Sequence, residues 1–167
     1  MMTNTPEVKK ILDFLGEIGI PVIFSALGKE CFLPGLSIES GAIIVDQEKL
    51  EYPGDMLHEA GHLAVVPAAD RSQLSGPTIG QRTDHAAEEM MAIAWSYAAC
   101  VHLGISPYFV FHEGGYHGGG KEIADNFIEG RYFGTPMLQW VGLTAEASKA
   151  TELGINPYPF MIRWLRE

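Results

Sequence analysis

The chain has 167 residues, of which 47% are hydrophobic and 19% charged, and its formal net charge is −10. This length and composition are those of one ordinary globular domain, and they exclude an intrinsically disordered chain. The acidic balance repels phosphate backbones and no long basic run offsets it, so we expect no nucleic-acid partner.

The distribution of apolar residues and cysteines predicts a cytoplasmic protein without membrane attachment. Residues 1–17 are polar and then amphipathic, unlike the basic-then-apolar pattern of a signal peptide. The longest nearly apolar run, residues 90–101, is too short to span a bilayer. The two cysteines, Cys31 and Cys100, lie outside any C-x-x-C pattern, which argues against a disulfide scaffold and against a thiolate metal site.

The first part of the sequence predicts one helix followed by short strands. Residues 5–19 begin with Thr-Pro-Glu, carry apolar residues at helical spacing and end in glycine, which is typical of an amphipathic helix. Residues 21–24 and 42–45 are short runs rich in Ile and Val, bounded by Gly and Pro, and both predict strands. Between them, residues 31–40 favour a further strand or an irregular hairpin.

Helices dominate the prediction for the later residues. Residues 68–82 are polar, contain Gly and Pro, and predict a loop. Residues 83–103 predict a long helix that is apolar nearly all round in its second half and therefore buried. Shorter helices are expected at residues 123–128 and 144–153.

The most informative stretch is residues 58–62, which match the H-E-x-x-H motif. On a helix, His58 and His62 lie on one face, so each can direct a ring nitrogen to a common metal ion. Glu59 projects about 100° round the helix from His58, beside such an ion rather than onto it. From there its carboxylate can take a proton from a water molecule, as a general base does.

The residues around the motif favour a helix with a defined start and end. Asp55 follows a Tyr-Pro-Gly turn and is placed as a possible N-cap, and Pro67 stops the helix-compatible run. Ala60 and Gly61 are small, which predicts that this helix lies very close to a neighbouring element.

A zinc site with two histidines usually takes a third protein ligand. One zincin pattern continues as H-E-x-x-H-x-x-G-x-x-H, but residues 63–68 contain neither the Gly nor the third His, which excludes that class. A carboxylate on the next predicted helix is the other solution, and Glu88 and Glu89 both stand near its start. Either could be the ligand, and both would also be ordinary residues of an exposed first turn.

These features resemble the gluzincin branch of the zinc metallopeptidases, in particular the small ImmA/IrrE-like proteins. The resemblance covers roughly residues 19–103. It rests on the Ile/Val-rich strand at residues 42–45, on the glycine before the second motif histidine, and on the surroundings of Glu89. That glutamate is followed by Ala92, Trp95 and Ser96 at the family's spacing, whereas Ile93 stands where the family often has Asn or Asp.

The resemblance implies an α+β, zincin-like fold, with a small, mostly antiparallel sheet packed on the motif helix and a second helix that carries the third ligand. One Zn²⁺ would be held by His58, His62 and Glu89, with Glu59 as the general base of peptide hydrolysis and a peptide or protein as substrate. The strand at residues 42–45 would bind an extended substrate at the sheet edge. The alternative is a zincin-like metal-binding module that regulates or interacts without turnover, or a metal-free polar cluster.

One domain is expected over residues 1–167, with a metal-site core at about 5–105 and an α-rich extension at about 106–167. The segment from His112 to His117 is either a flexible turn or a cover for the site in which Tyr116 or a histidine donates a hydrogen bond. His85, one helical turn before Glu89, is a candidate to brace or ligate. Aromatic residues of the extension are expected in the core: Trp140, Phe160 and Trp164.

Overall fold

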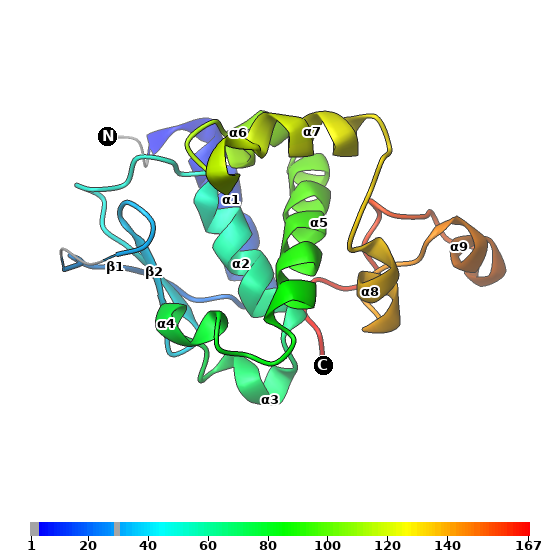
Figure 1. Cartoon of the computed structure of the whole chain (residues 1–167), viewed down its shortest axis with the longest axis horizontal. Coiled ribbons are helices and arrows are strands. Elements are labelled where there is room, and N and C mark those ends of the chain that lie inside the picture. The colour runs from blue at the N-terminus through cyan, green and yellow to red at the C-terminus, as the bar shows by residue number, and fades with distance from the viewer. Residues whose placement is uncertain (1–3, 29–30) are drawn as a thin grey trace.

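The computed structural model describes residues 4–28 and 31–167, and over these residues the chain is an α+β fold. Nine α-helices and one small sheet of three strands make up the described part (Figure 1). The elements are α1 (Pro6–Ile18), β1 (Val22–Phe24), β2 (Leu36–Glu39), β3 (Ala42–Val45), α2 (Asp55–Val65), α3 (Ala68–Arg71), α4 (Gly76–Ile79), α5 (His85–Leu103), α6 (Pro107–Val110), the 3₁₀ turn η2 (Tyr116–Gly118), α7 (Gly120–Ile128), α8 (Thr135–Trp140) and α9 (Ala147–Leu153).

Helix α1 forms as its sequence pattern predicts. The hydroxyl of Thr5 accepts a hydrogen bond from the amide of Val8 at 3.3 Å, which caps the N-terminus. Gly19 adopts a left-handed conformation (φ 87°) and ends the helix. The apolar stripe is buried in the core and comprises Val8, Ile11, Phe14 and Leu15.

The sheet is mixed rather than mostly antiparallel as expected, and its strand order is β1-β3-β2. β2 and β3 form an antiparallel hairpin whose turn holds Ser40 and Gly41 at positive φ (48° and 78°). β1 pairs with the opposite edge of β3 in parallel. The strand predicted at residues 42–45 is confirmed as β3, but its predicted position at the edge of the sheet is wrong. β3 is the central strand, all four of its residues are buried, and it is hydrogen-bonded to a neighbouring strand on each side.

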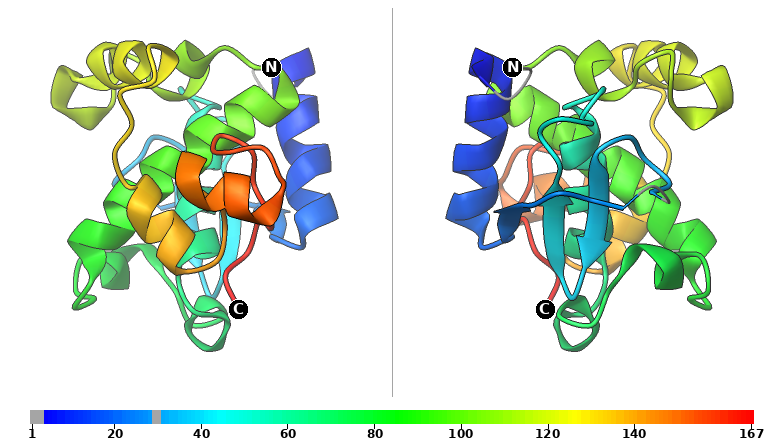
Figure 2. Two further views of the ribbon diagram at one scale, coloured as in Figure 1. Left: turned by 90° about the vertical axis from the view of Figure 1, so that its right-hand side faces the viewer. Right: turned by 90° about the vertical axis from the view of Figure 1, so that its left-hand side faces the viewer.

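Helix α2 lies at the centre of the molecule, with the sheet on one side and α5 on the other (Figures 1 and 2). Its apolar residues join the main hydrophobic core, to which α1 and both neighbouring strands also contribute. In α5 every residue from 91 to 100 is buried, as the all-round apolar pattern predicted, and Gly104 ends that helix in a left-handed conformation (φ 62°).

The expected loop at residues 68–82 contains two short helices, α3 and α4. Each of these helices has four residues, which is too short for a helical spacing of apolar residues to be recognised in the sequence. Side-chain contacts hold both helices in place. The hydroxyl of Thr78 donates to the carbonyl oxygen of Ser75 at 2.8 Å. The guanidinium of Arg71 donates to the carbonyl oxygen of Leu63 at 2.8 Å and also to that of Arg166, so it joins α3, the end of α2 and the C-terminal residues.

Residues 106–167 pack on the free side of α5 and return to the end of α2 (Figure 2). The indole of Trp95, fully buried in α5, donates to the carbonyl oxygen of Trp164 at 2.9 Å. Trp164 is half-buried and packs on the core as predicted. The same prediction is wrong for Trp140, which is 90% exposed, and for Phe160, which is 46% exposed.

The start of α9 also differs from its prediction. The helix begins at Ala147 with Glu146 as its N-cap, whereas Thr144 donates its hydroxyl to the carbonyl oxygen of Phe160 at 2.7 Å. Within the described ranges, no helix combines the length and the apolarity needed to cross a bilayer.

Replacing Trp95 with Phe removes both buried ring volume and the hydrogen bond to Trp164, and we expect the free energy of unfolding to fall by about 1–3 kcal/mol. The same change at the exposed Trp140 should alter it by less than about 0.5 kcal/mol. Urea unfolding followed by circular dichroism measures both. Equal losses in the two variants would contradict the positions of these tryptophans in the fold.

Candidate metal centre

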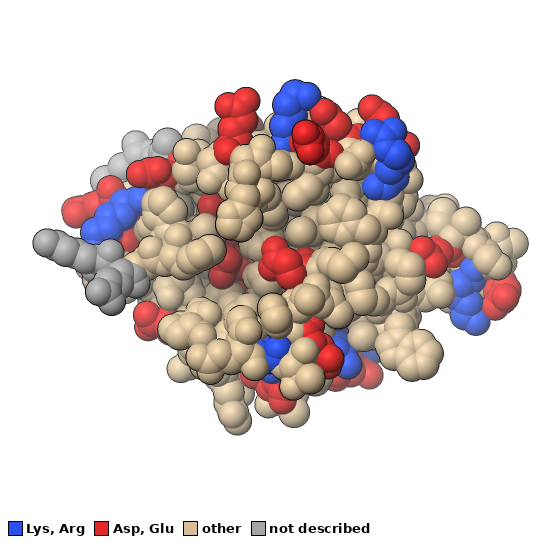
Figure 3. Space-filling view, in the orientation of Figure 1, with Lys and Arg blue, Asp and Glu red and all other residues tan. Residues whose placement is uncertain are grey.

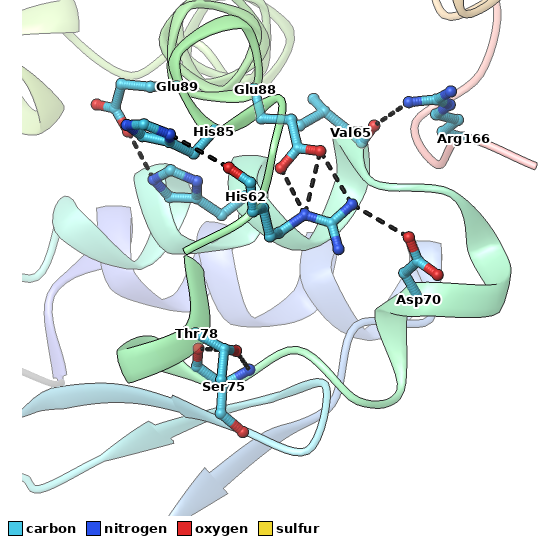
Figure 4. A network of polar contacts seen from close by, with 10 residues as sticks. His62, Val65, Asp70, Ser75, Thr78, His85, Glu88, Glu89 and Arg166 are labelled. Atoms are coloured by element: carbon cyan, nitrogen blue, oxygen red, sulfur yellow. Dashed lines mark hydrogen bonds and ion pairs between the residues drawn. The ribbon is translucent and has the colours of Figure 1, made fainter. Parts of the chain in front are cut away.

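The two motif histidines project from one face of α2 toward Glu89 on α5. Nε2 of His62 lies 2.8 Å from Oε2 of Glu89, and Nε2 of His58 lies 3.3 Å from Oε1 of the same carboxylate. The two Nε2 atoms are 3.1 Å apart. Figure 4 shows the contact between His62 and Glu89 across the two helices. Helical spacing brings the histidines together, and the packing of α2 on α5 adds the carboxylate.

This donor set fits a zinc ion in both chemistry and spacing. Two imidazole nitrogens and one carboxylate oxygen are typical ligands of a zinc site that keeps one position open. Ligand atoms placed tetrahedrally at about 2.0–2.1 Å from zinc lie about 3.3 Å from one another. Here the two Nε2 atoms are 3.1 Å apart, and the histidines lie 2.8 and 3.3 Å from different oxygens of the Glu89 carboxylate. One ligand atom from each residue lies within 4.8 Å of the others, so the three residues could hold one shared cation.

Glu88 and Glu89 are neighbours in the sequence but point in different directions (Figure 4). Glu88 is buried, with 3% of its surface exposed, and accepts hydrogen bonds from Nε of Arg82 at 2.8 Å and from its terminal nitrogen at 3.0 Å. Arg82 also donates to Asp70 at 3.1 Å, and Glu88 raises the pKa of the guanidinium. The alternative of two solvated first-turn glutamates is therefore wrong for Glu88, and only Glu89 faces the histidines.

The charges within the site stabilise one another. Burial would raise the pKa of Glu89, but its contacts with both histidines outweigh that effect and lower the pKa. Burial, the largest single effect, would lower the pKa of His58. The hydrogen bond to Glu89 and the negative charges of Glu89, Glu59 and Asp55 together outweigh burial, and the pKa is raised.

Glu59 stands beside the cluster without joining it. Burial raises the pKa of its carboxyl group, an effect that the nearby His62 and His58 oppose. Within the part of the chain that the structure describes, this carboxylate makes no hydrogen bond or ion pair. A half-buried carboxylate with a raised pKa next to a metal-type cluster is suited to accept and return a proton.

Asp55 has a different role from the predicted N-cap. The helix begins at Asp55 itself, and Gly54 occupies the N-cap position. The buried carboxylate of Asp55 instead accepts a hydrogen bond from Nε2 of His112 at 2.7 Å. Burial raises the pKa of Asp55, and the contact with His112 opposes that shift. No sequence signal connects these two residues, because they are 57 positions apart and meet only in the tertiary structure.

The segment from His112 to His117, for which the sequence left two alternatives, packs against the motif helix. The ring of His112 stacks on that of Tyr52 with centroids 3.9 Å apart and planes at 5°. The ring of Tyr116 stands edge-on to that of His58 at 5.3 Å and 80°. Burial raises the pKa of the Tyr116 phenol well above its usual value, and the carboxylates of Asp55, Glu89 and Glu59 add to the shift. The phenol therefore lies close to the cluster.

Two of the candidate histidines lie outside the site. Nδ1 of His85 donates to the carbonyl oxygen of Arg82 at 3.2 Å, and its side chain is exposed. Among the described residues, the ion pairs of Glu89 are with His58 and His62, not with His85. His117 is also exposed. Their positions in the sequence made both histidines candidates for the site. The local backbone geometry sets the direction of each side chain, and here it leaves both exposed to solvent.

The site opens onto one face of the molecule. Figure 3 shows carboxylates near the middle of this face, over α2 and α5, surrounded mostly by uncharged side chains. The side chain of Glu89 is 42% exposed, whereas that of His58 is only 13% exposed. The side chain of Glu89 is thus the most exposed of the three, while those of His58 and His62 are shielded from bulk water.

At Gly61 the helices α2 and α5 are in close contact. A Cβ atom added there would lie 2.8 Å from the carbonyl oxygen of Ala92 and 3.2 Å from its Cβ. The predicted close approach at the small motif residues is thus confirmed. Any side chain at this position would push the two helices apart, and with them the histidines and Glu89.

Comparison with known proteins gave no match for the chain. No protein-family model matches it, and no curated protein or solved structure is significantly similar. Its function must therefore be inferred from the residues of the site.

We expect Gly61→Ala to lower the free energy of unfolding by about 1–3 kcal/mol, because the methyl group overpacks the contact with Ala92. The matched control is Gly16→Ala in α1, where no atom lies within 4 Å of the added Cβ and stability should rise by about 0.5–1 kcal/mol. Chemical denaturation measures both variants. A Gly61→Ala protein as stable as the Gly16→Ala protein would show that the helices are not in tight contact.

Proposed function

We propose that this protein is a zinc-dependent hydrolase of peptide bonds with a zincin-like, gluzincin-type fold. One Zn²⁺ would be held by His58, His62 and Glu89, and Glu59 would act as the general base. The observation that carries this proposal is the convergence of two H-E-x-x-H histidines and a glutamate from the next long helix within 3.3 Å of one another. Three protein ligands leave a fourth position of a tetrahedral site open, which is the arrangement of catalytic zinc sites.

The bound ion would supply Lewis acidity, polarising the carbonyl group of the substrate and lowering the pKa of water. Glu59 would handle the proton. As the water oxygen bonds to the carbonyl carbon, Glu59 takes one proton, and it then delivers that proton to the leaving nitrogen as the C–N bond breaks. The products are a carboxylic acid and an amine, and Glu59 returns to its starting state.

A peptide or protein in the cytoplasm is the proposed substrate. The partly exposed carboxylate of Glu89 lies on an open face, so an extended chain can reach the cluster. The net charge of −10 favours a peptide over a nucleic acid. Because β3 is central, substrate binding along that strand is not part of the proposal.

The proposal is tested by replacing Glu59 with Gln in the full chain. We expect the variant to keep one zinc per chain, since Glu59 is not a ligand, and to lose hydrolysis by about 10²–10⁴-fold, since the proton acceptor is gone. Zinc is measured by elemental analysis and turnover with a mixture of fluorescence-quenched peptides. If the unmodified protein binds one zinc per chain but hydrolyses no peptide, the site belongs to a metal-binding regulatory module without turnover. If the unmodified protein binds no zinc, the three residues form a metal-free polar cluster.

The two adjacent glutamates allow a matched pair of variants that differ only in position. Glu89→Gln should lose stoichiometric zinc, because it removes the charged ligand. Glu88→Gln should keep zinc, but it weakens the contacts with Arg82 and should lower the free energy of unfolding by about 1–3 kcal/mol. Metal titration and urea unfolding separate the two effects. Zinc loss in Glu88→Gln alone would contradict the choice of ligand.

A further inference from the structure

The hydroxyl group of Tyr116 is buried and has no hydrogen-bond partner among the described residues. A buried polar group without a partner costs about 1–3 kcal/mol, so folded proteins rarely leave one unsatisfied. The ring of this tyrosine lies edge-on to that of His58 at 5.3 Å. A hydroxyl group that has no partner in the protein and lies beside a candidate metal ligand is available to donate a hydrogen bond to a bound substrate.

The segment that carries Tyr116 is fixed in place by side-chain contacts. His112 donates to Asp55 at 2.7 Å and stacks on Tyr52 at 3.9 Å. A Cβ at Gly114 would lie 2.6 Å from the Tyr52 ring, and one at Gly54 would overlap the carbonyl oxygen of Phe109. The glycines of this region therefore allow close packing, and the segment forms a wall of the site.

The backbone of this segment also adopts an unusual conformation. Tyr116 and His117 both have φ of 55°, in the left-handed region that residues other than glycine rarely occupy. Such a conformation costs about 1–3 kcal/mol per residue and persists only where the surroundings impose it. Here it directs the Tyr116 ring inward to His58, while His117 stays exposed.

We propose that Tyr116 is a catalytic residue whose phenol donates a hydrogen bond to the substrate carbonyl oxygen as that oxygen gains negative charge. Asp55 and His112 are positioning residues that hold the segment at this distance from the cluster. This inference rests on the proposed peptide hydrolysis and supplies the oxyanion donor that the H-E-x-x-H motif lacks.

Three other described donors that could stabilise negative charge are already engaged elsewhere. Arg82 is bound to Glu88 and Asp70, and His85 donates to the carbonyl oxygen of Arg82. Arg131, which could also stabilise negative charge, is exposed and donates to Asn126 at 2.9 Å. Tyr116 combines a free donor with a position against a cluster residue.

The test compares Tyr116→Phe with the unmodified chain, both loaded with zinc. The variant removes only the hydroxyl, so we expect one zinc per chain, an unchanged KM and a kcat lower by about 100-fold. The matched control is Tyr108→Phe, which removes the hydroxyl that contacts Asp125 on the exposed side of α6 and should leave kcat unchanged.

A second measurement does not depend on turnover. N-phosphoryl-leucinamide mimics the tetrahedral state of the reaction, and its affinity for the zinc-loaded chain can be measured by calorimetry. We expect Tyr116→Phe to bind it about 10-fold more weakly, which is the loss of roughly one hydrogen bond. Equal affinity and equal kcat in the two proteins would overturn the role of Tyr116.

The positioning role is tested at His112. His112→Ala should lower kcat and weaken the binding of the phosphoryl probe, as Tyr116→Phe does. His112→Gln retains a donor to Asp55, so most of the kcat and most of the affinity for the probe should be recovered. If Gln and Ala variants behave alike, the positioning role is overturned. An unmodified chain that binds zinc but hydrolyses no peptide would instead overturn the proposed function, and this inference with it, so the two failures are distinguishable.

Discussion

The contact between α2 and α5 sets the geometry of the candidate site. Gly61 meets the backbone and Cβ of Ala92, so the two helices approach more closely than side chains would otherwise allow. One turn away along α5, Glu89 then comes within 2.8 Å of His62. The core residues on both sides of α2 hold this arrangement, because a helix packed against a sheet and another helix has little freedom to shift.

Acidic residues gather around this contact, and each has a defined environment. Glu88 is neutralised by Arg82, Asp55 accepts from His112, and Glu89 faces the histidines. Of these four carboxylates, only that of Glu59 has no hydrogen bond or ion pair among the described residues, and burial raises its pKa. These carboxylates would repel one another in a bare cluster. Here three of them are each paired with a cationic or histidine side chain, and Glu59 is left with a raised pKa.

Residues far apart in the sequence complete the surroundings of the cluster. The segment 112–118 covers one side of His58 through Tyr116, and its anchors are Tyr52 and Asp55 at the start of α2. The C-terminal residues return to the other end of the same helix, where the amide of Arg166 donates to the carbonyl oxygen of Ala64 at 2.9 Å. Both ends of the motif helix are therefore fixed by later parts of the chain.

The sequence alone determined the elements with strong local signals: α1 with its Thr cap and glycine end, the length of α5, and the two histidines of α2. Helical spacing and capping are properties of neighbouring residues, so they can be read without the fold. Tertiary structure decided what depends on distant pairs: the parallel partner that makes β3 central, and the exposure of Trp140. It also turned Glu88 and Glu89 to different partners and brought His112 to Asp55, because a side chain's partner depends on which surfaces pack together.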